Sequence, residues 1–207
     1  MIKMKSIASD NESSAEEKIL DAARAHVRRF GEAKTNIVDI ARELGTSHTT
    51  IYRHFRSKAD VFDALVAEAM NDEEVLARTF VEGEQSASER LTGLVLALHR
   101  RKLERFENDH ELYLLYRRVV DERPEIVRNY AMAITRLLEA ILEDGVQQKE
   151  FRLNKVQSAA EVVRDAATVF VHPLHVEAAA KAGVSMEPSL HRVMATLISA
   201  FKAGVEF

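Results

Sequence analysis

The sequence predicts an all-α protein with a small N-terminal head and a larger helical body. Its 207 residues include only 7 Gly and 3 Pro. Turn signals are therefore too sparse for a sandwich or barrel, which needs one about every 8–12 residues. Apolar residues instead recur at helical spacing along most of the chain. Hydrophobic residues make up 46% and charged residues 30%, proportions typical of a globular rather than a disordered protein.

The first ordered helix is expected at 15–30, where Ile19, Val27 and Phe30 fall on one face. Gly31 follows as a stop signal. The preceding residues 1–14 contain lysines but no apolar segment, so they do not resemble a signal peptide. We expect them to form a flexible polar arm.

The segment 37–55 is predicted to form two short helices joined by a turn of about four residues that starts at Gly45. Thr35 or Asn36 can cap the first helix, because their side chains can bond its free N–H groups. In the second helix, Ile51 and Phe55 lie at i and i+4 and share the face that packs inward. This pattern is typical of a helix-turn-helix, whose second helix enters the DNA major groove.

Polar side chains are left for the outer surface of this segment. His48 and Thr49, at the start of the second helix, are the candidates for base-edge contacts, and Arg53 can reach a guanine edge or a phosphate. The other candidates suit phosphate contacts. The complete set of predicted DNA-binding residues is Thr35, Asn36, Thr46, Ser47, His48, Thr49, Thr50, Tyr52, Arg53, His54 and Lys58.

Charge is distributed unevenly along the chain, although its net value is −4. Residues 1–58 carry 11 basic and 8 acidic residues, a net of +3, while the remainder carries 18 basic and 25 acidic residues, a net of −7. A modestly basic head on an acidic body is compatible with DNA binding by one end of the molecule.

The body is predicted to contain helices with continuous apolar stripes. The pair Glu73-Glu74, in the first of them, is interpreted as a solvated charge run. Pro173 is expected to interrupt the longest segment, and Pro124 suits a first helical turn. The expected segments are 61–80, 86–106, 110–121, 124–146, 155–182 and 187–203.

Several function classes lack their sequence signals. No Cys occurs, which excludes disulfides and thiol chemistry and favours a cytoplasmic location. No apolar run reaches the roughly 18 residues of a membrane helix, and no phosphate loop, nucleophile elbow or HExxH string is present. His172 and His175 flank Pro173, but no further ligands are evident. We therefore expect neither an enzyme, a cofactor nor a metal site.

Two strings carry a resemblance to a known family: DIARELG at 39–45 and IYRHFRSKADVF at 51–62. They resemble the DNA-binding domain of the TetR family of repressors, and the resemblance covers about residues 15–65. Thr46 departs from the Val or Ile usual in that family, and His48-Thr49 replace residues that are often small. The Thr46 departure concerns packing at the turn, whereas His48-Thr49 concern which operator is read rather than whether DNA is bound.

The resemblance implies a DNA-binding domain at 15–60 and an effector-binding and dimerisation domain at 61–207. It also implies a repressor that binds a palindromic operator as a homodimer, through its last two helices at 156–182 and 187–203. A small-molecule effector of unknown identity would release it from the DNA. The polar residues expected to line the effector pocket are His99, Tyr113, Tyr116, Arg117, Asn129 and His172.

Two alternative functions come from other classes. A helical protein–protein interaction module predicts that substitution of Arg53 and Lys58 leaves DNA retention unchanged. A small all-α enzyme predicts turnover of a bound compound rather than its simple release.

Overall fold

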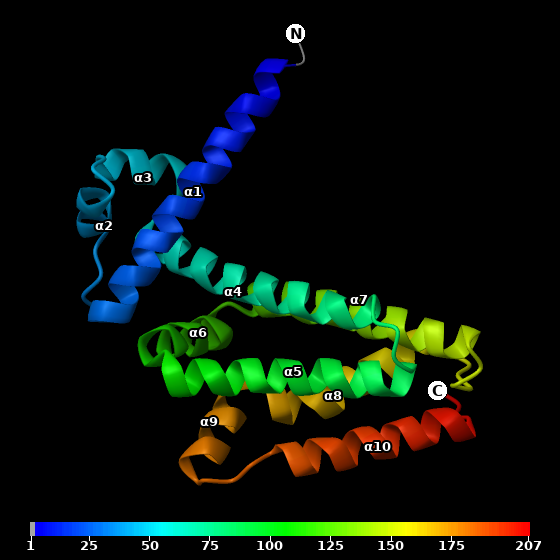
Figure 1. The fold of residues 1–207 in the computed structure, drawn as a ribbon. Coiled ribbons are helices and arrows are strands. Elements are labelled where there is room, and N and C mark those ends of the chain that lie inside the picture. Colours follow the sequence, from blue (N-terminus) through cyan, green and yellow to red (C-terminus); the bar gives the residue numbers. More distant parts are fainter. Residues whose placement is uncertain (1–2) are drawn as a thin grey trace. The chain divides into compact units, whose positions relative to one another are not determined.

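The computed structural model describes residues 3–207, with side chains from residue 14 onward. This part of the chain forms ten helices (Figure 1). Its one β pairing is an isolated bridge between Leu153 and Val205, so the all-α prediction is confirmed. The chain divides into two compact units: unit 1 comprises the residues up to Ala69 together with Asp109–Val119, and unit 2 comprises Met70–Asn108 and Val120–Phe207.

Unit 1 holds the predicted helix-turn-helix. Its helices are α1 (Lys3–Phe30), α2 (Ile37–Glu43), α3 (His48–His54), the first half of α4 (Lys58–Val81) and most of α6 (His110–Glu122). Helix α1 begins earlier than the expected residue 15, because the segment before it contains neither Gly nor Pro to stop a helix. Most of the predicted arm 1–14 is therefore helical, and its first two residues lie outside the described part.

Helix α1 packs through the expected stripe, with Ile19, Ala23 and Val27 buried. Phe30 was predicted to lie on this inward face, but it is 44% exposed. The helix ends at Phe30 and Gly31 turns the chain at φ +77°, so no further turn of helix covers the ring. Phe30 instead lies beside the imidazole of His26, with 5.6 Å between ring centroids.

Ion pairs join the elements of unit 1. Arg24 of α1 contacts Glu68 of α4 at 2.5 Å. Arg28 contacts Asp109 at 2.8 Å, and Glu32 contacts Arg118 of α6 at 2.9 Å. Ion pairs therefore link the 109–119 segment to α1 and to the residue Glu32 just after it, although this segment is far along the sequence from the helix-turn-helix.

Unit 2 is a helical bundle made of the second half of α4 and five further helices. These are α5 (Ala87–Asn108), α7 (Pro124–Gln147), α8 (Val156–Val171), α9 (Pro173–Lys181) and α10 (Glu187–Ala203). The predicted break at Pro173 is confirmed, since this residue has no N–H to continue α8. The predicted bounds of α10 are also confirmed.

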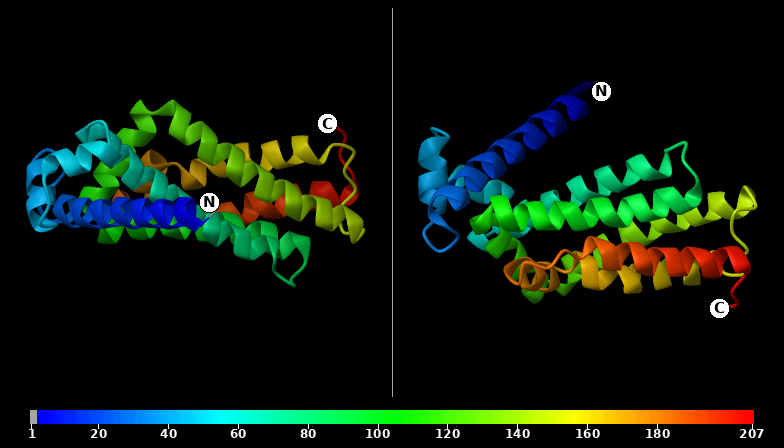
Figure 2. Two further views of the ribbon diagram at one scale, coloured as in Figure 1. Left: turned by 90° about the horizontal axis from the view of Figure 1, so that it is seen from above. Right: turned by 60° about the horizontal axis from the view of Figure 1, so that its bottom comes forward.

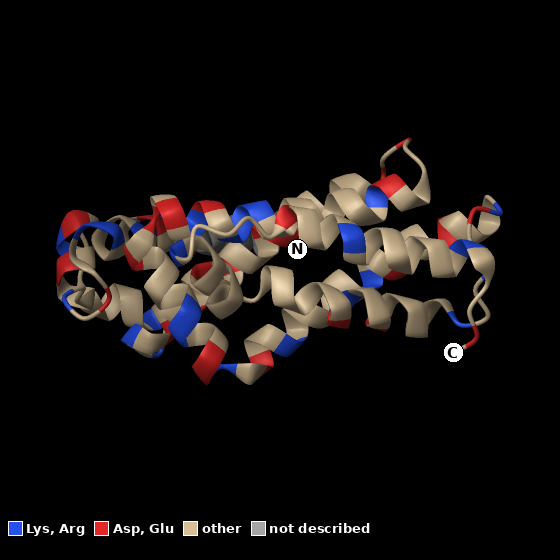
Figure 3. Cartoon of the chain, turned by 90° about the horizontal axis from the view of Figure 1, so that it is seen from below, with Lys and Arg blue, Asp and Glu red and all other residues tan. Residues whose placement is uncertain are grey.

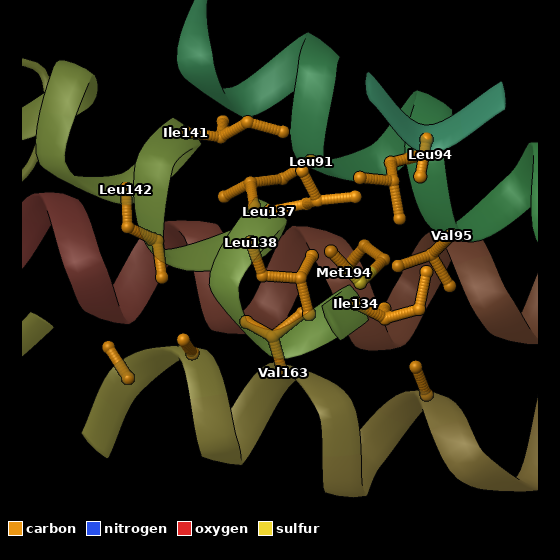
Figure 4. Close-up of a cluster of buried hydrophobic side chains, with 14 of the residues drawn as sticks. Leu91, Leu94, Val95, Ile134, Leu137, Leu138, Ile141, Leu142, Val163 and Met194 are labelled. Carbon is orange, nitrogen blue, oxygen red and sulfur yellow. The ribbon is translucent and has the colours of Figure 1, made fainter. Parts of the chain in front are cut away.

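The core of unit 2 is built from facing stripes of aliphatic side chains. Leu91, Leu94 and Val95 of α5 meet Ile134 and the leucines of α7, and Val163 of α8 and Met194 of α10 close the cluster (Figure 4). Helices α8 and α10 lie side by side in two views of the bundle (Figures 1 and 2). Apolar burial at roughly 25 cal/mol per Å² is the main force that holds such a core together.

A buried ion cluster links three helices inside unit 2. Glu73 of α4 is 0% exposed, so its interpretation as part of a solvated charge run was wrong. Its carboxylate accepts hydrogen bonds from Lys102 at 2.5 Å, from Arg105 at 3.0 Å and from the Tyr130 hydroxyl at 2.7 Å. We call Glu73, Lys102, Arg105 and Tyr130 the Glu73 cluster.

Burial pushes the pKa of Glu73 upward, but the charges and hydrogen bonds around the carboxylate outweigh this effect. Lys102 and Arg105 act through their charge, and Lys102 and Tyr130 donate hydrogen bonds, so the pKa of Glu73 is held below its usual value of 4.5. The carboxylate is therefore ionised at neutral pH.

Gly145 of α7 lies close to Ala87 of α5 and to the ring of Phe151. A Cβ at this position would stand 2.8 Å from Cβ of Ala87 and overlap the buried ring of Phe151. We expect Gly145→Ala to lower the free energy of unfolding by ~1–3 kcal/mol through overpacking, measured by urea denaturation. Gly183→Ala is not a suitable control because its φ is +67°. Ser199→Ala, at an exposed site on α10, should change stability far less.

No helix in the described part of the chain is both long and apolar enough to cross a membrane.

Candidate nucleic-acid interface

The turn between α2 and α3 depends on Gly45. Its φ is +63°, a conformation that side chains with a Cβ rarely adopt. Thr46 N donates to Ala41 O at 2.9 Å and Gly45 N donates to Arg42 O at 3.2 Å, the pairing of a Schellman motif. The end of α2 is thereby satisfied by its own backbone, and the chain is redirected into α3.

Helix α3 begins with a side-chain cap. The Oγ of Ser47 accepts a hydrogen bond from the backbone N of Thr50 at 3.2 Å, and the two hydroxyls lie 3.0 Å apart. Such a cap satisfies one of the free N–H groups of a helix start. Ser47 and Thr50 thus fix where α3 starts, which limits their freedom to contact DNA.

The recognition helix divides into a buried and an exposed face, as predicted. Ile51 is 0% exposed, whereas His48, Thr49, Tyr52 and Arg53 are exposed. The rings of His48 and Tyr52 meet edge to face, with centroids 6.3 Å apart. One side of α3 therefore anchors it to unit 1, and the other presents hydrogen-bonding side chains together.

Thr35 was predicted to hold the DNA backbone, and the structure contradicts this. The residue is 0% exposed, and its hydroxyl donates to the carbonyl of Gly31 at 2.8 Å. Its backbone N also donates to Gly31 O. Thr35 therefore stabilises the loop before α2 and is removed from the DNA-binding candidates.

We expect Thr35→Val to cost ~1 kcal/mol of unfolding free energy, because it deletes a buried hydroxyl and leaves the Gly31 carbonyl one donor short. Operator affinity of the folded protein should stay unchanged. Thermal unfolding and a DNA titration, compared with Thr49→Val on the exposed face, distinguish the two roles. A loss of affinity in Thr35→Val equal to that in Thr49→Val would restore Thr35 as a contact.

The remaining predicted residues occupy different surroundings. Asn36 is exposed before α2, where its side chain makes no cap bond. Thr46 is exposed in the turn, and His54 is half-buried with its Nδ1 3.6 Å from Glu16. Lys58 opens α4, and its Nζ lies 5.3 Å from the Phe62 ring.

Arg56 was missed in the sequence-based set. It is exposed in the connection between α3 and α4, beside Ser57, whose hydroxyl accepts from the backbone N of Asp60 at 3.1 Å. The sequence feature that could have identified Arg56 is its positive charge, two residues before Lys58. Lys and Arg are interspersed with Asp and Glu along the helices (Figure 3), so the positive charge of this segment is local.

The predicted effector residues do not fall in one unit. Tyr113 and Tyr116 are buried in unit 1, which also holds Arg117. In unit 2, His99 is buried, and its Nδ1 lies 2.8 Å from the carbonyl of Phe170. Asn129 is exposed on α7, so its predicted place inside a pocket was wrong.

His172 has an unusual environment at the junction of α8 and α9. Its Nδ1 is buried and has no hydrogen-bond partner. Burial and the nearby His175 lower the pKa of His172, Lys102 lowers it further, and Asp121 opposes them. The imidazole is therefore neutral at neutral pH and keeps a hydrogen-bonding atom unused.

Unit 2 also has two open grooves along α5. One, of about 570 Å³, lies between α4 and α5 and includes Leu76, Phe80 and Arg100. The other, of about 660 Å³, lies between α5 and α10 and includes Leu96 and Ile198. None of the six predicted effector residues lines either groove.

The rings of His172 and His175 lie with centroids 5.6 Å apart. Across the described residues, no group of three or more His, Cys, Asp and Glu side chains is placed to hold a metal ion.

Solved structures share this fold at low sequence identity. The transcriptional regulator FadR from Bacillus subtilis in complex with stearoyl-CoA is 18% identical, with a TM-score of 0.57 over 91% of this chain and 98% of that one. A transcriptional regulator from Cytophaga hutchinsonii is 17% identical, with a TM-score of 0.66 over 90% and 97%. RolR in complex with resorcinol is 12% identical, with a TM-score of 0.60 over 93% and 90%.

A search of curated proteins gave no match. Family profiles, however, match both parts of the chain. The profile described as "Bacterial regulatory proteins, tetR family" matches residues 19–65, which contain the helix-turn-helix. The profile described as "Tetracyclin repressor-like, C-terminal domain" matches residues 87–197, more than half of the sequence. The chain therefore belongs to the TetR family of DNA-binding transcriptional regulators.

Proposed function

We propose that this regulator is a repressor that binds a palindromic operator as a homodimer and is released by a small-molecule effector. The observation that carries the DNA-binding part is the division of α3, with Ile51 buried and His48, Thr49, Tyr52 and Arg53 exposed. An exposed row of donors and acceptors on a short helix held by a capped turn is what major-groove reading needs.

Each exposed residue has a distinct role in this proposal. His48 and Thr49 contact base edges, and the Thr49 methyl can also pack on a thymine methyl. Arg53 binds a guanine edge or a phosphate. Tyr52, Lys58 and Asn36 bind phosphates and so fix the register of α3 on the duplex. Arg56, exposed beside them, adds a further phosphate contact.

The homodimer is proposed to form through α8 and α10. Apolar side chains on these helices remain half-buried or exposed, namely Val162, Ala166 and Val169 on α8 and Val193 and Leu197 on α10. A second copy would cover them. Two-fold pairing places two recognition helices about one DNA turn, ~34–36 Å, apart, and so explains why a palindrome is read.

We place the effector site in the helical body that the family profile matches, and we propose that effector binding there releases the protein from DNA. FadR and RolR, which share the fold, were solved with stearoyl-CoA and resorcinol. An effector acts by binding more tightly to the conformation that does not fit the operator. Helix α4 belongs to unit 1 at its start and to unit 2 at its end, so it is the proposed mechanical link.

Selection from a random-sequence duplex pool at two salt concentrations tests the DNA-binding part. The expected result is enrichment of a palindrome with half-sites one helical turn apart. Salt-sensitive retention without any enriched sequence would reduce the function to generic phosphate affinity. If the ligand-free protein retains no duplex at either salt concentration, the result would contradict the proposal and favour a protein-interaction module.

A further inference from the structure

The Glu73 cluster has the composition of a carboxylate-binding site. One ammonium, one guanidinium and one phenol converge on a single carboxylate, at 2.5, 3.0 and 2.7 Å. Lys102 is 4% exposed and Arg105 is 13% exposed, so these donors meet the anion largely shielded from bulk water. Charge-assisted hydrogen bonds in such surroundings are short and strong. In this structure the carboxylate that occupies the site is the side chain of Glu73.

A second observation beside the cluster points to a ligand. The buried Nδ1 of His172 has no hydrogen-bond partner, although buried polar atoms are nearly always paired. His172 joins α8 to α9, and both helices pack against α5, which carries Lys102 and Arg105. A ligand that bonds to Nδ1 of His172 in the ligand-bound protein would explain why this atom has no partner among the protein's own side chains.

We propose that the effector of this regulator carries a carboxylate, which displaces Glu73 from Lys102, Arg105 and Tyr130 and bonds to His172. This inference rests on the proposed ligand response and names the class of compound that produces it. Glu73 belongs to α4, whereas the donors belong to α5 and α7. Displacement therefore breaks the charged link between α4 and the rest of unit 2: the donors pair with the incoming anion, and α4 must move so that the displaced Glu73 carboxylate reaches water.

The competition has a clear consequence for affinity. In the native protein, an incoming carboxylate must replace one that is already held by three donors. Without the Glu73 side chain, the same donors surround a space the size of a small acid. Small carboxylates should therefore bind the variant Glu73→Ala much more tightly than the native protein.

The first experiment is rescue of Glu73→Ala by formate or acetate, followed by thermal unfolding. We expect a lowered melting temperature that millimolar formate or acetate largely restores. Acetamide and sodium chloride at the same concentration should not restore it. The fitted affinity for acetate should exceed that of the native protein by at least ~10-fold, equal to ~1.4 kcal/mol. Restoration by chloride or acetamide to the same degree would overturn the carboxylate site.

Glu187→Ala is the matched control. It removes the carboxylate partner of Arg100, which contacts it at 2.7 and 2.9 Å, but that guanidinium is 60% exposed. Water can solvate the exposed cation, so acetate should not raise the melting temperature of this variant beyond the effect of chloride. Equal rescue of both variants would show a general salt effect and contradict the inference.

A second variant covers the case in which Glu73→Ala does not fold. Tyr130→Phe removes one donor and keeps the ring that packs over Lys102, whose Nζ lies 5.0 Å from its centroid. Acetate, butyrate, octanoate and benzoate would each be titrated against the complex of native protein and operator. The acid that releases the native protein would then be titrated against the complex of Tyr130→Phe and operator. We expect at least one acid to release the native protein, and a several-fold higher concentration to be needed for Tyr130→Phe. Release by none of them, or at equal concentrations in both, would overturn the inference.

The outcomes separate this inference from the proposed function. If the protein binds a specific operator and a neutral compound releases it while no carboxylate does, the repressor proposal stands and the carboxylate effector is wrong. Failure to bind any operator would remove the proposed function itself, while rescue of Glu73→Ala by acetate would still support the carboxylate site.

Discussion

Replacing Lys102 with Met is expected to lower the free energy of unfolding by about 1.5–3 kcal/mol, because it deletes the ammonium donor of a buried carboxylate that Arg105 and Tyr130 still hold. The Glu73 side chain is 0% exposed and the Lys102 side chain is 4% exposed, with 2.5 Å between Oε2 and Nζ. Met preserves most of the apolar stem. The loss therefore reports the missing ammonium rather than a cavity.

Urea denaturation at neutral pH measures this loss, and Arg100→Met provides the control. Arg100 also pairs with a glutamate, but its side chain is 60% exposed, so water replaces the lost partner. The double variant Glu73→Leu/Lys102→Met should recover only part of the stability lost in Lys102→Met: apolar replacement of a buried pair is often neutral, but Arg105 loses its carboxylate partner as well. A small loss in Lys102→Met, similar to that in Arg100→Met, would mean that water reaches the carboxylate.

The same cluster predicts a dependence of stability on pH. The pKa of Glu73 in the folded protein is lowered from its usual 4.5, so the unfolded state binds more protons in acid. The stabilisation by the ionised carboxylate is then fully present above pH 4.5 and declines as the pH falls below it. Urea midpoints measured from pH 7 to pH 3 should fall less steeply for Glu73→Gln than for the native protein. Parallel curves for the two proteins would contradict this assignment.

The sequence predicted the helix-turn-helix geometry better than it predicted this cluster, and the reason is physical. The helix-turn-helix depends on short-range signals, such as Gly45 at the turn, the Ser47 cap and Ile51 on the inward face, and each of these is visible in a single segment. Glu73 is buried because partners on α5 and α7 meet it. Such partners are far away in sequence, so a charged pair on a helix looked like solvated surface.

One local signal for Glu73 did exist. Val66, Met70, Glu73 and Ala77 follow the helical spacing of α4, and all four are buried. A carboxylate in register with an apolar stripe is predicted to be buried, and a buried charge requires partners. The predicted effector residues lacked any such signal. Tyr113 and Tyr116 are buried in unit 1, and Asn129 lies on the exposed face of α7, because pocket walls are set by helix packing rather than by residue type.

The double variant Arg53→Ala/Lys58→Ala is expected to weaken operator binding by ~2–6 kcal/mol, at least ~30-fold, if each side chain supplies ~1–3 kcal/mol. Arg53 is exposed on α3, and Lys58 begins α4 just after the α3–α4 connection. Neither residue belongs to the buried stripes of unit 1, so the fold should be retained. Fluorescence anisotropy with the selected operator at several salt concentrations measures the affinity and its salt dependence together.

Salt dependence assigns the role of each residue. A side chain that neutralises a phosphate contributes about one unit to the slope of log affinity against log salt, whereas a contact to a base edge changes the preference for one base pair. Lys58→Ala alone should therefore reduce the slope and weaken all sequences equally. Arg53→Ala should do the same if it binds phosphate, or relax the preference at one position if it binds guanine. Arg78→Ala, exposed near the end of α4 in unit 2, should change neither quantity. Equal losses in Arg78→Ala and in the double variant would mean that net charge, rather than the α3 surface, holds the DNA.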